Sequence, residues 1–161
     1  MAAHPRSPRE ITLEFFARLL LAGWIGSWAG FGLLVAPTAF RVLPSTQVAG
    51  QLVGPIVSAL HWYGVAAGVL LALLARRRGG GALLFVLPLV AAALCAYSEL
   101  GITPQIAAIR PLVFGPEGSP ELAARFQVLH RASVAIFLTV GLSTLALLAA
   151  QVRADAARGD T

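Results

Sequence analysis

Four long apolar stretches, separated by short polar segments, dominate the pattern of the chain. They cover residues 17–37, 55–74, 82–102 and 128–150. A helix rises 1.5 Å per residue, so about 20 apolar residues are enough to cross the hydrocarbon core of a bilayer. The pattern therefore predicts an all-α, integral membrane four-helix bundle. In this prediction residues 15–150 form the membrane domain, and residues 1–14 and 151–161 are polar tails.

Proline, glycine and arginine mark the ends of the apolar stretches. Residues 38–54 are predicted to connect the first two spans, and Arg76, Arg77 and Arg78 followed by three glycines predict a stop and a turn. Residues 105–119 are predicted to form a loop, with a short interfacial helix as an alternative. Ser119-Pro120-Glu121 has the cap, first-turn proline and acid that are typical of a helix start.

A cleaved signal peptide is the alternative for the first apolar stretch. The polar leader is long for a signal peptide, the stretch contains Trp24 and Trp28, and no A-x-A cleavage site follows it cleanly. These features favour a spanning helix.

Composition supports a membrane protein and excludes several other classes. Hydrophobic residues make up 58% of the chain and charged residues 12%, against roughly 25% charged residues in a soluble domain. So few charges cannot cover a water-facing surface, which excludes an ordinary soluble enzyme and a disordered chain. The single cysteine, Cys95, excludes a disulfide scaffold. The expected partner is the lipid bilayer and not nucleic acid, because the basic residues lie between apolar runs and form no patch.

The distribution of arginine predicts the orientation. All 12 basic residues are arginine, as is typical of proteins from GC-rich bacterial genomes. Four spans place both termini and the loop between spans two and three on one side. That side carries Arg6, Arg9, Arg18, Arg76, Arg77, Arg78, Arg153 and Arg158, and the other carries Arg41, Arg110, Arg125 and Arg131. The positive-inside rule then predicts an inner-membrane protein with cytoplasmic N and C termini.

Small residues recur at four-residue spacing on two of the spans. They are Ala22, Gly26 and Gly30 on the first span and Gly64 and Gly68 on the second. Such faces let membrane helices approach closely. We expect them to pack inside one bundle, with a seam between copies in a homo-oligomer as the alternative.

Three ionisable residues inside or beside the spans are the candidates for chemistry. They are His61, Glu99 and His130, which the topology places in the outer half of the bundle. Ionisable groups within a membrane are functional candidates by default. Two imidazoles and a carboxylate could bind a transition metal, His61 and His130 could hold a haem iron, and a His–Glu pair could relay protons. Alternatively, Glu99 pairs with Arg131 or Arg110 and the histidines bond to the backbone.

No motif of a known catalytic site is visible. The chain has no G-x-S-x-G, no phosphate-binding loop and no H-E-x-x-H. An enzyme is therefore the less favoured class.

Several stretches resemble a known family. Residues 32–41 read GLLVAPTAFR and continue VLPSTQVAGQLVG, the third span ends YSELGITPQIAAIR, and the fourth opens FQVLHRASV. These stretches resemble the transmembrane protein 205-like family of small multi-pass membrane proteins, which is distantly similar to the copper-resistance D group. The resemblance covers residues 16–148.

The resemblance implies a four-helix membrane domain and no defined activity. The signature positions that it implies are Pro37, Phe40, Pro104, Phe126, His130 and Ser133. The distant kinship to copper proteins favours a metal site, but Met1 and Cys95 are the only sulfur residues, which disfavours soft metals.

Taken together, the sequence predicts a small multi-pass inner-membrane protein with a polar pocket for a small ligand in the outer half of the bundle. The first alternative is a haem- or transition-metal-binding protein of redox or homeostasis function. The second is a transport subunit or partner-binding membrane module.

Overall fold

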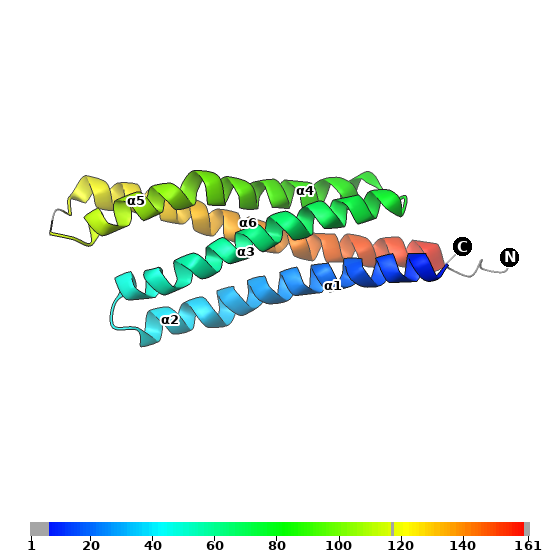
Figure 1. Ribbon diagram of the computed structural model, residues 1–161, viewed down its shortest axis with the longest axis horizontal. Coiled ribbons are helices and arrows are strands. Elements are labelled where there is room, and N and C mark those ends of the chain that lie inside the picture. The colour runs from blue at the N-terminus through cyan, green and yellow to red at the C-terminus, as the bar shows by residue number, and fades with distance from the viewer. Residues whose placement is uncertain (1–6, 117, 160–161) are drawn as a thin grey trace.

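The computed structural model describes residues 7–116 and 118–159 and arranges them as four long helical rods (Figure 1). The first rod consists of α1 (Pro8–Gly30), the π-helical segment η1 (Phe31–Val35) and α2 (Ala36–Val42). The second is α3 (Thr46–Arg77). The third consists of α4 (Ala82–Tyr97), the π-helical segment η2 (Ser98–Ile102) and α5 (Thr103–Val113), and the fourth is α6 (Pro120–Gly159).

The all-α prediction is confirmed for the described residues. Four of the helical stretches are long and apolar enough to cross a membrane, namely Pro8–Val42, Thr46–Arg77, Ala82–Val113 and Pro120–Ala157. Large apolar side chains cover the outside of the rods, among them Leu33, Val128 and Leu142. An outer surface of this kind fits hydrocarbon as the surrounding solvent.

The helices extend further than the apolar pattern indicates. Helix α1 begins at Pro8, inside the expected N-terminal tail, because Ser7 and Glu10 form a capping box with reciprocal bonds to the backbone. Residues 1–6 and 160–161 of the expected tails lie outside the described residues. The expected connection at residues 38–54 is almost entirely helical, with a turn only between Val42 and Thr46. The expected loop after the third span begins with helix α5.

The expected start of the fourth helix is confirmed. Helix α6 begins at Pro120, and the hydroxyl of Ser119 accepts a hydrogen bond from the backbone N–H of Leu122 at 3.3 Å. That bond satisfies one of the free N–H groups of the first turn.

Each π-helical segment is followed by a helix whose second residue is proline. The N–H of Ala36 donates to the carbonyl of Phe31 before Pro37, and the N–H of Thr103 donates to the carbonyl of Ser98 before Pro104. Proline has no N–H and its ring crowds the preceding turn. The wider π turn therefore lets both rods continue through a residue that would break an ideal α-helix.

Helices α3 and α4 approach each other most closely at two glycines of α3. A Cβ atom at Gly68 would lie 2.5 Å from the carbonyl oxygen of Pro88, and one at Gly64 would lie 2.7 Å from Sγ of Cys95. Trp24 of α1 is fully buried against the same two positions. These glycines therefore pack inside one bundle, as the spacing predicts.

The small-residue face of α1, with Ala22, Gly26 and Gly30, does not face the core of the bundle. Ala22 and Gly26 are exposed, and a Cβ atom at Gly26 or Gly30 would meet nothing within 4 Å. The expectation that this face packs inside the bundle is therefore wrong for Gly26 and Gly30. The core beside α1 is instead filled from its other face by Ala17, Leu21, Trp24 and Trp28.

The two ends of the bundle differ in their connections. Both chain ends and the α3–α4 turn lie at one end, and the α2–α3 and α5–α6 connections lie at the other (Figure 1). We call the first the terminal end and the second the loop end. His61 and Glu99 lie near the middle of their rods, within α3 and η2 respectively, and not in the outer half that the topology predicted.

Candidate functional site

A buried polar cluster joins α3 to the π-helical segment η2. The carboxylate of Glu99 accepts a hydrogen bond from Oγ of Ser58 at 2.6 Å, and its other oxygen lies 3.4 Å from Nδ1 of His61. The hydroxyl of Thr103 reaches the same oxygen at 3.5 Å. Two of the three sequence-predicted residues, His61 and Glu99, are thus brought together from positions 38 residues apart.

The cluster is closed toward the bundle and slightly open on one side. The side chain of His61 is 0% exposed and that of Glu99 is 11% exposed. The ring of Trp28 lies 5.8 Å from the imidazole, and its Nε1 donates to the carbonyl of Phe137 at 2.8 Å. Phe137 stacks on Trp28 at 4.7 Å. The aromatic wall beside His61 is therefore fixed by its own hydrogen bond and stacking.

The carboxylate determines which imidazole nitrogen carries the proton. An ionised carboxylate only accepts hydrogen bonds, so we assign the proton of neutral His61 to Nδ1, which faces Glu99. Nε2 then presents a lone pair, and this atom has no hydrogen-bond partner among the described residues. An imidazole oriented in this way can accept a hydrogen bond or a proton, or it can bind a metal.

Two further buried polar atoms near His61 also have no partner among the described residues. They are Nε1 of Trp24 and Oγ of Ser98. A Cβ atom at Gly64 would lie 3.2 Å from Nε1 of Trp24 and 2.7 Å from Sγ of Cys95. Trp24 lies at the level of Gly64, and His61 and Ser98 are each one turn away from Gly64 and Cys95, so the three atoms lie in two adjacent layers of the bundle. Buried polar groups normally bond to protein, water or ligand.

His130 occupies a different environment. It is exposed, and its ring stacks on Phe126 with 6.0 Å between centroids and 5° between planes. Phe126 in turn meets the edge of Phe114 at 5.6 Å. The structure therefore places His130 in an aromatic group between α5 and α6. No hydrogen bond or ion pair connects it to His61 or Glu99 in the part of the chain that is described.

The predicted metal triad does not form. Within residues 7–116 and 118–159, no group of three or more histidine, cysteine, aspartate or glutamate side chains is placed to hold a metal ion. Haem ligation by two histidines fits equally poorly, because His61 is completely buried and His130 is exposed on the bundle surface. The described residues thus offer a carboxylate–imidazole pair but no complete ligand set.

The alternative ion pair of Glu99 with an arginine does not form either. In the described part of the chain, Glu99 makes its bonds to Ser58, His61 and Thr103 and no ion pair to Arg110 or Arg131.

The remaining signature residues lie around the two π turns and on α6. Pro37 and Pro104 are the second residues after η1 and η2, and Phe40 is 45% exposed on α2. Ser133 is half-buried on α6. None of these residues contributes a hydrogen bond to the Glu99 cluster among the interactions of the described residues.

The sequence analysis missed Ser58 and Thr103 as site residues. Ser58 precedes His61 by three residues and Thr103 follows Glu99 by four, so each shares a helix face with the ionisable residue. Hydroxyl residues at these spacings were the signal that could have identified them.

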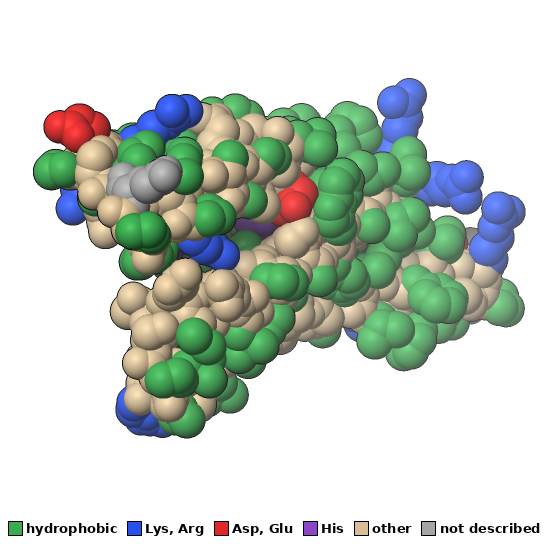
Figure 2. Space-filling model, turned by 60° about the vertical axis from the view of Figure 1, so that its left-hand side comes forward, with side chains coloured by type: hydrophobic (Ala, Val, Ile, Leu, Met, Phe, Trp, Pro, Cys, Tyr) green, Lys and Arg blue, Asp and Glu red, His purple; other side chains and the backbone are tan. Residues whose placement is uncertain are grey.

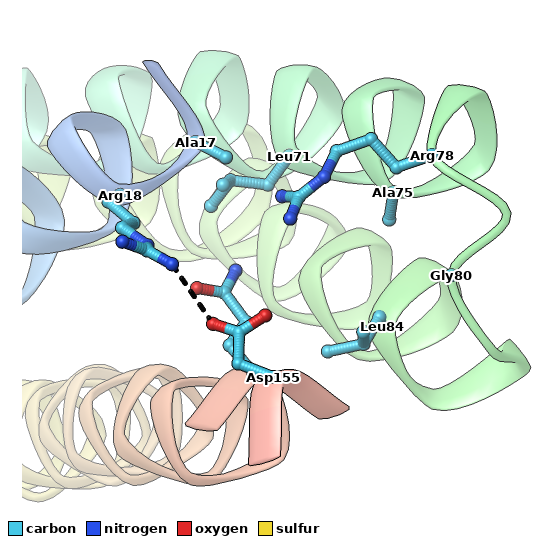
Figure 3. Close-up of a pocket in the computed structure, with 9 residues that line it drawn as sticks. Ala17, Arg18, Leu71, Ala75, Arg78, Gly80, Leu84 and Asp155 are labelled. Atoms are coloured by element: carbon cyan, nitrogen blue, oxygen red, sulfur yellow. Dashed lines mark hydrogen bonds and ion pairs between the residues drawn. The ribbon is translucent and has the colours of Figure 1, made fainter. Parts of the chain in front are cut away.

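A second group of charged residues lies at the terminal end of the bundle. Arg78 donates to Glu14 at 2.9 Å, and Arg18 donates to Asp155 at 3.2 Å. Figure 3 shows Arg18 and Arg78 facing a small space between α1, α3 and α6. This cavity measures about 30 Å³, room for about one water molecule. Its size and its ion pairs indicate a structural clamp between helices.

Comparison with known proteins identifies one similarity. Residues 19–113, from α1 to the end of α5, match the sequence model of a family described as a domain of unknown function, DUF4149. The searches of curated proteins and of solved structures gave no match.

Proposed function

This chain belongs to the DUF4149 family of domains of unknown function, and we propose that it is a multi-pass inner-membrane protein that binds a small polar ligand at His61 and Glu99. The site lies near the middle of the bundle, and the proposal places the loop end on the outer side of the membrane. The orientation is supported by arginine, with eight residues on the terminal side and four on the other.

The similarity to the transmembrane protein 205-like family is part of this proposal. The stretches that carry it include Pro37 and Pro104, and Pro104 ends the π turn that holds Glu99. Segments of π-helix inside α-helices occur frequently at functional sites. The position of Glu99 in η2 therefore agrees with a functional role for this turn.

One observation carries the proposal. The imidazole of His61 is fully buried, Glu99 fixes one of its nitrogens, and the other has no partner among the described residues. Leaving a buried polar atom unpaired costs about 1–3 kcal/mol. A ligand that bonds to Nε2 recovers this free energy, whereas a purely structural histidine would be expected to bond at both nitrogens.

Native mass spectrometry of the protein released directly from membrane vesicles tests the proposal. We expect a non-covalent small-molecule adduct on the wild type, and its loss in His61→Phe and Glu99→Leu. His130→Ala is the matched control, because this histidine is exposed and outside the cluster. An adduct that is equally abundant in all four proteins, or absent from the wild type, would contradict the proposal.

A further inference from the structure

Arg110 on α5 lies in the same groove as the Glu99 cluster. Its Nη1 donates to the backbone carbonyl of Gly50 on α3 at 3.0 Å. A Cβ atom at Gly54 would lie only 3.4 Å from the same nitrogen. The guanidinium therefore lies against the face of α3 that carries Gly50 and Gly54. Arg110 is half-buried and has no acidic partner among the described residues. Four of its five N–H donors have no hydrogen-bond partner among the described residues.

Two facing helix surfaces form this groove. One belongs to η2 and α5 and carries Glu99, Thr103 and Arg110, and the other belongs to α3 and carries Gly50, Gly54, Ser58 and His61. Figure 2 shows a hollow near the loop end in which basic, histidine and acidic side chains lie close together. The groove thus has a positive end at Arg110 and a negative end at Glu99.

The distance between the two charges follows from their contacts with α3. The Arg110 guanidinium contacts Gly50 and Gly54, and the Glu99 carboxylate contacts Ser58 and His61 further along the same helix. At 1.5 Å per residue, the nearest of these contact points, Gly54 and Ser58, are about 6 Å apart, and the midpoints of the two pairs are about 11 Å apart. No ion pair joins Glu99 to Arg110 among the described residues, so the two charges do not bond directly and one small molecule can touch both.

We propose that this groove binds a small zwitterion, with its ammonium group at Glu99 and its carboxylate or phosphate group at Arg110. Charge-assisted hydrogen bonds of about 2.8 Å at each end, with one to three atoms between the charged groups of the ligand, span about 8–11 Å in total, which lies within this range. The inference rests on the proposed function, because Glu99 and His61 belong to both sites. In this arrangement Nδ1 of His61 bonds to the carboxylate of Glu99 and orients it toward the ammonium group.

Charge balance excludes the simpler ligands. An anion bound at Arg110 alone leaves the Glu99 carboxylate facing it within a low-dielectric groove, and a cation bound at Glu99 alone faces the guanidinium. A zwitterion pairs both charges and adds no net charge to the membrane interior. Two sources supply this chemistry, namely a free amino acid and the headgroup of an ethanolamine phospholipid.

Thermal unfolding of the full chain in phosphatidylcholine nanodiscs tests the inference, because a ligand that binds the folded state raises the midpoint temperature. The probes are glycine and phosphoethanolamine, each compared with acetate and with ethylammonium at the same ionic strength. A second set of nanodiscs contains phosphatidylethanolamine and distinguishes a lipid headgroup from a free zwitterion. The comparison of probes on the wild type is independent of whether any variant folds.

We expect the zwitterionic probes, or the ethanolamine lipid, to stabilise the wild type and the singly charged probes to have no effect. Arg110→Gln and Glu99→Gln should weaken the affinity at least about tenfold, the effect of losing one charged hydrogen bond. Arg131→Gln, at an exposed arginine of α6, is the matched control and should bind as the wild type does. Arg110→Lys keeps the positive charge and should retain part of the affinity.

Three results would overturn the inference. They are no response to any zwitterion, an equal response to acetate or ethylammonium, and a wild-type response in Arg110→Gln. If any one of these results is obtained while the mass-spectrometric adduct still depends on His61, the zwitterion is wrong and the ligand site at His61 and Glu99 stands. If the adduct is also absent, both proposals fail.

Discussion

His61 and Glu99 contact each other inside the apolar bundle, with 3.4 Å between the imidazole Nδ1 and the carboxylate Oε2. The contact joins α3 to η2 and uses only one nitrogen of a ring that is 0% exposed. An ionisable pair in a membrane domain is costly to retain without a role. The predictions below test what this pair does and what holds its surroundings in place.

Replacing Glu99 by leucine should destabilise the protein. The change removes the acceptor of the Ser58 hydroxyl and of Nδ1 of His61 and leaves both groups unpaired, at a cost of about 1–3 kcal/mol. Glu99→Gln keeps a carbonyl acceptor and should cost less. Thermal unfolding can be followed with a thiol-reactive dye, because Cys95 is the only cysteine and is fully buried. Equal midpoints for leucine and glutamine would contradict the prediction.

Gly68→Val should disrupt the contact between α3 and α4. The new side chain would begin 2.5 Å from the backbone carbonyl of Pro88, which cannot move without bending α4. Overpacking of this kind costs about 1–3 kcal/mol or more. Gly26→Ala is the matched control, since its Cβ atom meets nothing within 4 Å and alanine is the better helix former. A valine variant as stable as the wild type would show that the helices lie further apart.

A cysteine at Ser58 should react with a small water-soluble thiol reagent. Ser58 is half-buried and bonds to Glu99 in the groove, whereas Ala59 next to it is exposed on the outside of the bundle, where lipid is expected. Reaction at Ser58→Cys but not at Ala59→Cys would show that water enters the groove. Reaction of neither cysteine would contradict a groove open to water. Reaction of both would contradict the expected difference between the groove and the lipid-covered outside.

The three arginines of the α3–α4 turn should fix the topology. We expect replacement of Arg76, Arg77 and Arg78 by glutamate to disturb the proposed cytoplasmic location of the termini, because it removes much of the positive excess of that side. Reporter domains fused to each end measure the location. Wild-type locations of both reporters in the variant would contradict the assignment.

Purified protein should show no Soret band and no stoichiometric transition metal. His61 is buried and His130 is exposed beside Phe126, so the two imidazoles do not face one iron. Visible spectroscopy and metal analysis of the detergent-purified protein provide the measurement. A chromophore that is lost in both His61→Ala and His130→Ala would show that the two histidines share a cofactor.

The apolar pattern was sufficient to predict the four spans, because a bilayer imposes the same length requirement on every one of them. It could not predict that α2 and α5 continue the first and third rods, since their stretches contain Pro37, Arg41, Pro104 and Arg110, which usually mark loops. The capped helix start at Ser119 was readable because a cap depends on residues next to one another.

The candidate site was only half predictable. Position along two separate spans indicated that His61 and Glu99 lie at a similar depth, but the rotation of each helix decides which residues face each other. That rotation depends on packing, for example on the glycines Gly64 and Gly68 against α4. Trp28 contacts both His61 and Phe137, whereas His130 is exposed and lies two turns before Phe137, nearer the loop end. The sequence therefore grouped His130 with the pair, and the structure separates it in both depth and direction.

The π-helical segment η2 has a geometric consequence for the groove. A π turn accommodates one more residue than an α turn, so it offsets the angle at which every later side chain leaves the rod. Glu99 lies within this turn and Arg110 lies beyond it. The turn therefore sets the rotation of α5 relative to α4 about the axis of the rod. Deleting one of its residues would rotate Arg110 away from α3 and would leave α4 in place.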